Sequence, residues 1–368
     1  MAKIKVVQPS MPPIEEYVAE IQSIWENRWL THTGPKHQQL VHALSELLGT
    51  QEISLFSNGH QALEAAFSLF PVGSEVITTP FTFASTTLAI ARCGLVPVFC
   101  DIEPAFYTMD PAKIEALITE KTVAIAPVHV YGYLCDWRRI GEIAAKHKLK
   151  VIYDAAHAFG VSEGGINAGS LGDISMFSFH ATKVFHTIEG GCLAHHDAQL
   201  SRQFAAWRQF GMFDGEQSEM MGTNAKLTEF AAAMGLCNLR HLDAQIMQRK
   251  AVVERYRERL SGQNGLVIGG EQSGVTANYA YFPIRILPEQ FGRDRNAVAD
   301  ALAQQEIFVR KYFYPLTADF PLCRNNFTVA PTPIAAQASR QILCLPLYAD
   351  LTRIEVDQVC DAILKQSI

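Results

Sequence analysis

The stretch "VAIAPVHVYGYLCDWRRIGEIAAKHKLKVIYDAA", Val123 to Ala156, joins two short apolar runs through a segment of helical period. The helical segment begins at Asp136, a residue type that favours the N-cap position of a helix. A strand that is followed by a helix and a second strand implies a crossover connection, which pairs the two strands in parallel. This stretch therefore predicts one unit of a parallel sheet with helices on its faces.

The same alternation extends from Ile53 to His196. Segments of helical period, such as 60–70 and 110–120, separate most of the apolar runs. Near-continuous apolar runs are typical of strands that are covered on both faces, so the predicted fold class is α/β with a large, mostly parallel sheet. The seven candidate strands are "ISLFS" (53–57), "EVITTP" (75–80), "VPVFCD" (96–101), "VAIAPVHV" (123–130), "KVIYDAA" (150–156), "DISMFSF" (173–179) and "GGCLAHH" (190–196).

Beyond His196 the alternation stops, because 197–211 and 226–262 both have helical period with no strand between them. After Gly270 it restarts, which predicts a smaller α/β domain. We place an N-terminal segment and the large domain in residues 1–245, and the small C-terminal domain in 246–368. The elements expected in the small domain are a strand (279–287), a helix (293–307), a second strand (308–315) and a final helix (351–366).

Composition excludes several classes of protein. A length of 368 residues with 48% hydrophobic content is expected to form about two globular domains. The formal net charge of -6 gives no basic field for nucleic acid, and no apolar run approaches the ~18 residues of a membrane span. Eight scattered cysteines without a C-x-x-C pair argue against a zinc site, and we expect no metal. We interpret these cysteines as reduced core residues of a cytoplasmic protein.

Polar residues gather at the predicted carboxyl ends of the strands, where open parallel sheets bind ligands. Asn58 and Gly59 precede a helix whose first amides could seat a phosphate, although an ordinary Asn-Gly turn is the alternative. Asp154 ends an apolar run and needs a cationic partner, which is either a neighbouring side chain or the protonated ring nitrogen of a cofactor. Ser178 ends the sixth strand as a candidate phosphate donor.

Lys183 follows Ser178 by five residues and is the one evident nucleophile among these positions. The chain contains no G-x-G-x-x-G, no G-x-x-x-x-G-K-[ST], no H-E-x-x-H and no G-x-S-x-G motif. A neutral lysine amine attacks carbonyl carbons, and this chemistry suits an enzyme that uses pyridoxal 5′-phosphate. A solvated lysine at a strand end is the alternative interpretation.

Five motifs in this order resemble the DegT/DnrJ/EryC1/StrS family of sugar aminotransferases over nearly the whole chain. They are "SNGHQAL" (57–63), "TTPFTFASTTLAI" (78–90), "YDAAHAFG" (153–160), "SFHATK" (178–183) and "GTNAKLTEFAAAMG" (222–235). The resemblance implies the type I fold of pyridoxal phosphate-dependent aminotransferases and a homodimer with shared active sites. It also implies transfer of an amino group from L-glutamate to a keto-deoxysugar carried on a nucleotide, in deoxyamino sugar biosynthesis such as that of the O-antigen of lipopolysaccharide.

The resemblance also assigns roles to single residues. Lys183 is implied to hold the cofactor's aldehyde, and Asp154 to pair with its ring nitrogen. The other implied cofactor contacts are Phe83 on the ring, His157 near the phenolic oxygen, and Gly59, His60, Ser178 and the partner subunit's Asn224 at the phosphate. The implied substrate contacts are Trp29, Thr31, His186 and Tyr314. One departure stands out, because His60 occupies a position where the family usually has threonine.

Segments 8–40, 127–132 and 178–191 resemble the branch of the family that makes 4-amino-4,6-dideoxyglucose on dTDP. We therefore expect amination of C4 of dTDP-4-keto-6-deoxyglucose, and amination of C3 of a 3-keto sugar is the alternative. A sugar dehydratase of the same fold is a further alternative, in which histidine takes the place of the lysine. A non-catalytic regulatory relative is the last, and Lys183, Asp154 and Ser178 together argue against it.

Overall fold

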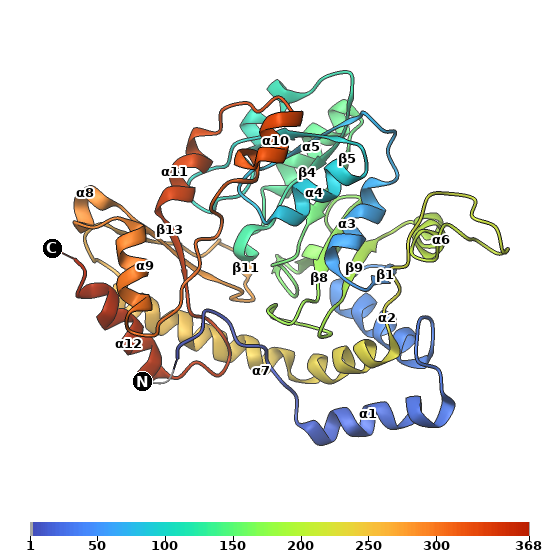
Figure 1. The fold of residues 1–368 in the computed structure, drawn as a ribbon, viewed down its shortest axis with the longest axis horizontal. Helices are drawn as coiled ribbons and strands as arrows, with labels where there is room; N and C mark the ends of the chain where they lie inside the picture. Colours follow the sequence, from blue (N-terminus) through green and yellow to red (C-terminus); the bar gives the residue numbers. More distant parts are fainter. Residues whose placement is uncertain (1–2, 368) are drawn as a thin grey trace.

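The computed structural model describes residues 3–367, and its large domain is built around a seven-stranded sheet (Figure 1). The strand order is β1-β9-β8-β5-β4-β2-β3. Strand β9 runs antiparallel to both of its neighbours, whereas the other neighbouring strands pair in parallel. The predicted α/β class and all seven predicted strands are confirmed. The strands are β1 (Glu52–Phe56), β2 (Glu75–Thr78), β3 (Val96–Phe99), β4 (Thr122–Ala126), β5 (Lys150–Asp154), β8 (Ile174–Ser178) and β9 (Gly191–His195).

Helices cover both faces of this sheet, because successive strand residues point to opposite sides. In β8, Phe177 packs into one apolar core, and Ile174 and Met176 pack into the other. The first core is closed by α2 (Pro35–Leu48), α5 (Trp137–His147) and the first half of α7 (Glu229–Leu260). The second core is closed by α3 (Gly59–Phe67), α4 (Ala84–Arg92) and α6 (Ala198–Trp207).

The small domain has an antiparallel sheet of order β10-β12-β13, which α7, α9 and α12 cover through a core of its own. Its elements are β10 (Leu266–Ile268), β12 (Phe282–Ile286), α8 (Pro288–Phe291), α9 (Arg295–Ala303), α10 (Pro321–Asn326), α11 (Pro333–Gln341), β13 (Ile342–Leu345) and α12 (Arg353–Leu364). A third, short sheet contains β6 (Ser162–Glu163), β7 (Ile166–Asn167) and β11 (Val275–Thr276), and α1 (Ile14–Asn27) lies along α7 (Figure 1).

The long helix α7 crosses the position where we placed the domain boundary. It runs along the large domain and continues into the small one, so residues 245 and 246 lie within one unbroken helix (Figure 1). At the other end of the chain, Ile4 forms a bridge with Ile307 and packs into the core of the small domain. The boundary between residues 245 and 246 stays a prediction.

Two predicted elements are wrong. Residues 110–120 form two single 3₁₀ turns, Pro111–Lys113 and Glu115–Leu117, because these turns already bring the apolar side chains of this segment onto the large core. Residues 308–315 form no strand beyond an isolated bridge between Arg310 and Cys344. Pro315 has no N–H for a ladder, and Phe313 turns into an aromatic cluster between the domains instead.

Candidate active site

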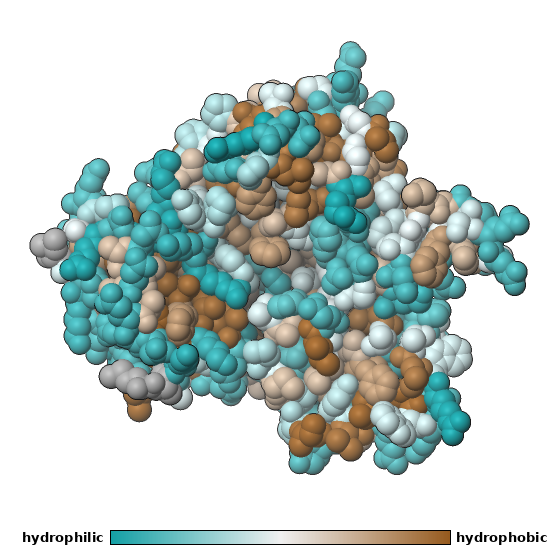
Figure 2. Space-filling model, viewed as in Figure 1, coloured by the Kyte–Doolittle hydropathy of each residue, from teal (hydrophilic) through white to brown (hydrophobic). Residues whose placement is uncertain are grey.

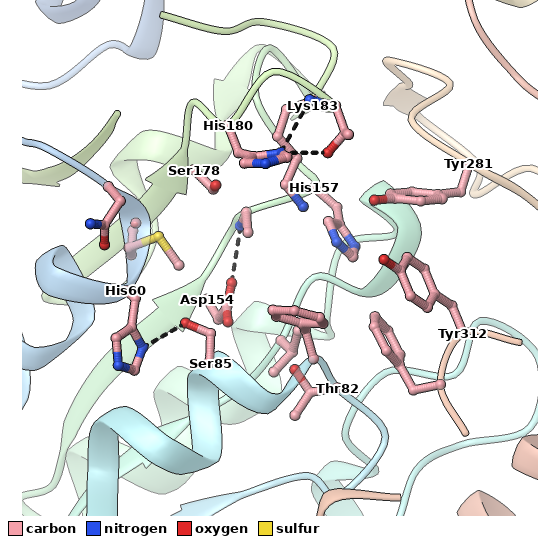
Figure 3. A pocket seen from close by; sticks show the side chains of 18 of the residues that line it. His60, Thr82, Ser85, Asp154, His157, Ser178, His180, Lys183, Tyr281 and Tyr312 are labelled. Atoms are coloured by element: carbon pink, nitrogen blue, oxygen red, sulfur yellow. Dashed lines mark hydrogen bonds between the residues drawn. The ribbon is translucent and has the colours of Figure 1, made fainter. Parts of the chain in front are cut away.

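A cavity of about 470 Å³ lies at the carboxyl ends of β5 and β8, between the two domains (Figure 3). Seven of the residues that the sequence predicted for the site line this one cavity, although they are up to 124 positions apart in the chain. The sheet explains the convergence, since the ends of parallel strands meet at one edge. The seven are Gly59, His60, Phe83, Asp154, His157, Ser178 and Lys183.

Lys183 lies in the turn after β8, where its backbone N–H donates to the carbonyl of His180 over 2.9 Å. Burial lowers the pKa of its amine from 10.5 to about 8, with Asp154 opposing the change and Arg310 adding to it. A lysine with this pKa keeps a substantial fraction of neutral amine near neutral pH. Lys183 is therefore suited to attack a carbonyl carbon.

Asp154 is the last residue of β5, and its carboxyl group is buried. The hydroxyl of Thr86 donates to Oδ2 over 2.6 Å, and the backbone N–H of Ala156 donates to Oδ1 over 3.1 Å. Burial raises the pKa of this carboxyl above its ordinary value, while the two donors and Lys183 act in the opposite direction. A carboxyl group held in this way is oriented to meet a cation inside the cavity.

His157 presents one ring nitrogen to the cavity. The backbone N–H of Tyr131 donates to its Nδ1 over 3.1 Å, which assigns the ring proton to Nε2. Burial holds the pKa of the ring well below its ordinary value, and the positive charge of Lys183 adds to this effect. The ring is therefore neutral, and its Nε2–H is a donor on the cavity side.

The amino end of α3 forms one end of the cavity and has the chemistry of an anion seat. Its N-cap is Asn58, whose side chain accepts from the N–H of Gln61 over 2.9 Å. A Cβ added to Gly59 would lie 3.0 Å from Cβ of Ser178 and 3.1 Å from Sδ of Met176. Glycine thus lets the first turn of α3 approach β8, so that free backbone N–H groups and the Ser178 hydroxyl face one volume. This donor set fits the phosphate group of pyridoxal phosphate.

The opposite side of the cavity is aromatic and comes partly from the small domain (Figure 3). Phe83 precedes α4, is 56% exposed, and meets the ring of Tyr312 edge-on at a centroid distance of 6.5 Å. Tyr281 lies with its ring centroid 4.6 Å from that of His157. An exposed ring beside an open cavity is available to stack on a flat ligand.

Five predicted residues do not line the cavity of their own chain. His186 is buried elsewhere, with Nε2 2.6 Å from the carbonyl of Ser10 and Asn238 beside the ring. It is a core histidine that ties the N-terminal segment to α7. The other four are exposed: Trp29, Thr31, Asn224 and Tyr314.

The sequence prediction missed the residues that the small domain brings to the cavity. These residues lie in segments without a motif, and one of them, Arg310, falls in the wrongly predicted strand. Position after a strand end could have indicated His180, and nearness to Phe83 could have indicated Ser85. The lining residues that were missed are Thr82, Ser85, Val128, Ala156, Met176, His180, Thr182, Glu189, Tyr281, Arg310, Tyr312 and Phe313.

Residues 13–364 match the DegT/DnrJ/EryC1/StrS aminotransferase family. The chain belongs to this family. It is an aminotransferase, as the other members of the family are. The resemblance predicted from its motifs is confirmed. Similar solved structures include a putative pyridoxal phosphate-dependent aminotransferase of Bacillus cereus and the pyridoxal phosphate form of a putative sugar aminotransferase of Streptococcus pneumoniae, and the residues around the cavity fit that cofactor.

Similar proteins cover almost the whole chain. A dTDP-4-amino-4,6-dideoxy-D-glucose transaminase of Shigella dysenteriae is 40% identical over 349 residues, which are 95% of either chain. A GDP-perosamine synthase of Caulobacter vibrioides is 31% identical and covers 99% of this chain and 98% of its own. The crystal structure of DesI with its TDP-sugar product superposes with a TM-score of 0.94 at 30% identity, over 99% of this chain and 92% of that one.

No group of three or more His, Cys, Asp or Glu side chains within residues 3–367 could hold a metal ion. Among the helices of the same residues, none is both long and apolar enough to cross a membrane.

Proposed function

We propose that this aminotransferase moves the amino group of L-glutamate to C4 of dTDP-4-keto-6-deoxyglucose and forms dTDP-4-amino-4,6-dideoxyglucose. The observation that carries the chemistry is the buried Lys183, with its pKa near 8, in one cavity with Asp154 and the anion seat of α3. The sugar is supported by the 40% identity to the Shigella transaminase. Amination of C3 is the second candidate, because neighbouring ring carbons differ little in reach.

The residues around the cavity divide the work of holding pyridoxal phosphate. When bound, the cofactor supplies a carbon that carries the amino group and a ring that withdraws electrons from the reacting carbon. Asp154 would stabilise a proton on the ring nitrogen, and Nε2–H of His157 would donate to the ring's oxygen substituent. Phe83 would cover one face of the ring. The N–H groups of α3 and the hydroxyl of Ser178 would hold the phosphate.

Lys183 performs two tasks in this scheme. Its neutral amine would hold the cofactor's aldehyde carbon, and a pKa of about 8 leaves part of the amine in this neutral form at neutral pH. With its amine free, Nζ of Lys183 would accept the proton of the glutamate carbon next to the nitrogen in one half-reaction, and would donate a proton to the sugar carbon in the other. The same atom serves both half-reactions, because it stays in the cavity throughout.

Arg310 is the group we assign to the carboxylates of glutamate. It carries the one guanidinium among the cavity-lining residues of the described chain, and it lies near enough to Lys183 to lower the pKa of that amine. Guanidinium binds carboxylate through two parallel hydrogen bonds, which fixes the orientation of an amino acid. A cation is needed there, since an unpaired carboxylate in a cavity of this burial is unfavourable.

We further propose a homodimer in which each cavity is completed by Asn224 of the partner subunit. Asn224 is exposed and lies outside the cavity of its own chain, in a segment that follows the projecting loop after α6 (Figure 1). Helix α1 also exposes an apolar stripe of Ile14, Val18 and Trp25. Figure 2 shows brown patches along the bottom of the molecule, where α1 lies. A second copy of the chain would cover such a stripe. Trp29, Thr31 and Tyr314 are proposed to contact the sugar nucleotide in that dimer.

We assign the enzyme to the cytoplasm. The eight cysteines are all free, and seven of them are buried, which suits a reducing compartment.

The test offers the purified enzyme L-glutamate with dTDP-4-keto-6-deoxyglucose, with its 3-keto isomer, and with a GDP-linked 4-keto-6-deoxy sugar. We expect turnover of the first, with the new amine located at C4 by NMR. Turnover of the 3-keto isomer alone would replace C4 by C3 and leave the aminotransferase assignment intact. Turnover of the GDP sugar alone would overturn the assignment of the nucleotide.

A further inference from the structure

His60 is linked to two neighbours at the anion seat. Its Nδ1 lies 2.9 Å from the hydroxyl oxygen of Ser85, and its Nε2 lies 3.4 Å from Oε1 of Glu64. Figure 3 shows His60 on α3 and Ser85 on α4 side by side at one end of the cavity. Both residues line the cavity, together with Gly59 and Ser178. The side chains of Glu64, His60 and Ser85 thus form a chain of polar contacts that ends at the anion seat.

The charges around the His60 ring determine which of its two nitrogens carries the proton when the ring is neutral. The pKa of the Glu64 carboxyl lies below its ordinary value, chiefly because of its interaction with His60, and Arg92 on α4 contributes too. Glu64 is therefore an anion, and it stabilises a proton on Nε2 of His60. The neighbouring thiol of Cys93 has a pKa raised to about 11 by burial and stays neutral. The other titratable groups on the cavity wall are Asp154, His157, His180, Lys183, Glu189, Arg310, Tyr281 and Tyr312.

With one proton held on Nε2, the charge of the His60 ring decides whether the Ser85 hydroxyl can donate a hydrogen bond into the cavity or can only accept one. In the neutral ring, Nδ1 is a bare acceptor, and the Ser85 hydroxyl donates its single proton to it. Only the lone pairs of the hydroxyl oxygen then remain for a ligand. In the protonated ring, Nδ1–H donates to Ser85 instead, and the hydroxyl proton is free to reach an anion.

We propose that His60 is a positioning residue which turns Ser85 into a phosphate donor when it is protonated, so that the phosphate of the cofactor binds with uptake of a proton. The protonated ring also brings a positive charge to the seat. The freed hydroxyl proton and this charge both strengthen the binding of the phosphate. Affinity for the phosphate therefore falls as pH rises and the ring of His60 loses its charge. This inference rests on the proposed use of pyridoxal phosphate.

The experiment uses two probes without an aldehyde, so that Lys183 forms no bond with them. Binding of pyridoxine 5′-phosphate and of pyridoxine to the cofactor-free enzyme is measured by calorimetry between about pH 5.5 and 8.5. The phosphate of the probe titrates in the same range, but this contribution cancels in the ratio of affinities of two enzyme variants. Pyridoxine, which lacks the phosphate, reports the rest of the cavity.

Three substitutions separate the roles. His60→Asn places an amide that does not titrate near the position of Nδ1, and Ser85→Ala removes the hydroxyl. His42→Asn is the matched control, because Nε2 of His42 also lies 3.4 Å from a glutamate oxygen, that of Glu46, on the exposed surface of α2. Cofactor-free variants are first compared by thermal unfolding, which shows whether each one is folded.

We expect the ratio of the wild-type affinity to that of His60→Asn to fall about 10-fold from the acid to the alkaline end, the effect of one hydrogen bond to a charged group. Ser85→Ala should lose most of this pH dependence, and His42→Asn should behave as the wild type. A constant ratio, or a full pH dependence that survives in Ser85→Ala, would overturn the proposal. If the wild type binds pyridoxine 5′-phosphate no better than pyridoxine at any pH, the cofactor assignment itself is wrong. Should His60→Asn not fold, proton uptake on binding is measured in two buffers for the wild type and for Ser85→Ala, and the titration of the probe cancels in the difference. Equal proton uptake by the two would overturn the proposal.

Discussion

At the scale of single residues, the reactivity of Lys183 depends on its burial. In water its amine would be almost fully charged at neutral pH, whereas the cavity lowers its pKa to about 8. The reactive form is the neutral amine, which increases as pH rises. We predict that the rate at which the cofactor-free enzyme captures pyridoxal phosphate rises with pH through about 8 and is level above it. Stopped-flow absorbance of the captured cofactor measures this profile.

Two variants locate this chemistry on one lysine. After borohydride reduction, mass spectrometry should find the cofactor on the peptide that contains Lys183, and Lys183→Ala should have neither the adduct nor turnover. Lys250→Ala is the matched control, since Nζ of Lys250 lies on the surface of α7 with a distant partner, Glu254, at 3.8 Å. An adduct that persists in Lys183→Ala would show that another amine is the nucleophile.

At the scale of elements, Glu229 at the start of α7 caps the neighbouring helix α2. Its carboxylate accepts from the backbone N–H groups of Lys36 and His37 over 2.8 and 2.9 Å, because the N-cap of α2 is Gly34, which has no side chain to do so. We predict that Glu229→Ala lowers the free energy of unfolding by about 2 kcal/mol, as it leaves two N–H groups without an acceptor. Urea unfolding at equal protein concentration measures the loss.

Two companions test the cause of that loss. Glu229→Gln keeps one side-chain oxygen as an acceptor and should lose roughly half as much stability. Glu254→Ala, at an exposed position of the same helix, should change stability by less than about 0.5 kcal/mol. Equal losses in Glu229→Ala and Glu254→Ala would contradict the capping role.

Two helical glycines should respond in opposite ways to alanine. Gly141 lies inside α5 with no atom within 4 Å of an added Cβ, so Gly141→Ala should stabilise the protein by about 0.5–1 kcal/mol. Gly59→Ala places a Cβ 3.0 Å from Ser178 and moves α3 away from the anion seat. We predict that it weakens binding of pyridoxine 5′-phosphate, which calorimetry detects. Unchanged affinity in Gly59→Ala would mean that the seat is elsewhere.

At the scale of the whole molecule, shared active sites predict complementation between two inactive variants. Lys183→Ala and Asn224→Ala homodimers should each have little activity. In a mixed dimer, however, one cavity receives Lys183 from one chain and Asn224 from the other. We predict that mixing under subunit exchange restores roughly a quarter of the wild-type activity, since half of the dimers then hold one intact site of two. Steady-state assays before and after exchange measure the recovery.

The control for complementation uses the exposed stripe of α1. Trp25→Glu places a charge at a position that is 70% exposed in the single chain and is covered in the proposed dimer. It should shift sedimentation towards the monomer and prevent the recovery. A monomeric wild type with full activity would contradict the shared site.

Much of the large domain could be predicted because its signals are local. Strands of the parallel sheet are continuous apolar runs, and Asp136 marks the start of α5 as a side-chain cap to the N–H of Arg139. The predicted helix at 110–120 is wrong because its signal was also only local. Helical period alone does not distinguish one helix from two short turns. His186 was assigned to the substrate from its place in a motif, and the structure buries it against Ser10.

The sequence by itself determined the α/β class, the order of the strands along the chain and the choice of Lys183, Asp154 and Ser178 as candidate site residues, because periodicity and short motifs act over a few neighbouring residues. Tertiary structure alone decided which residues share the cavity. Arg310 and Tyr312 come to Lys183 from the small domain, more than 120 positions away, and no periodic signal marks such a contact. It also decided the pKa of Lys183 and the polar chain through His60, since both depend on burial and on distances between separate elements.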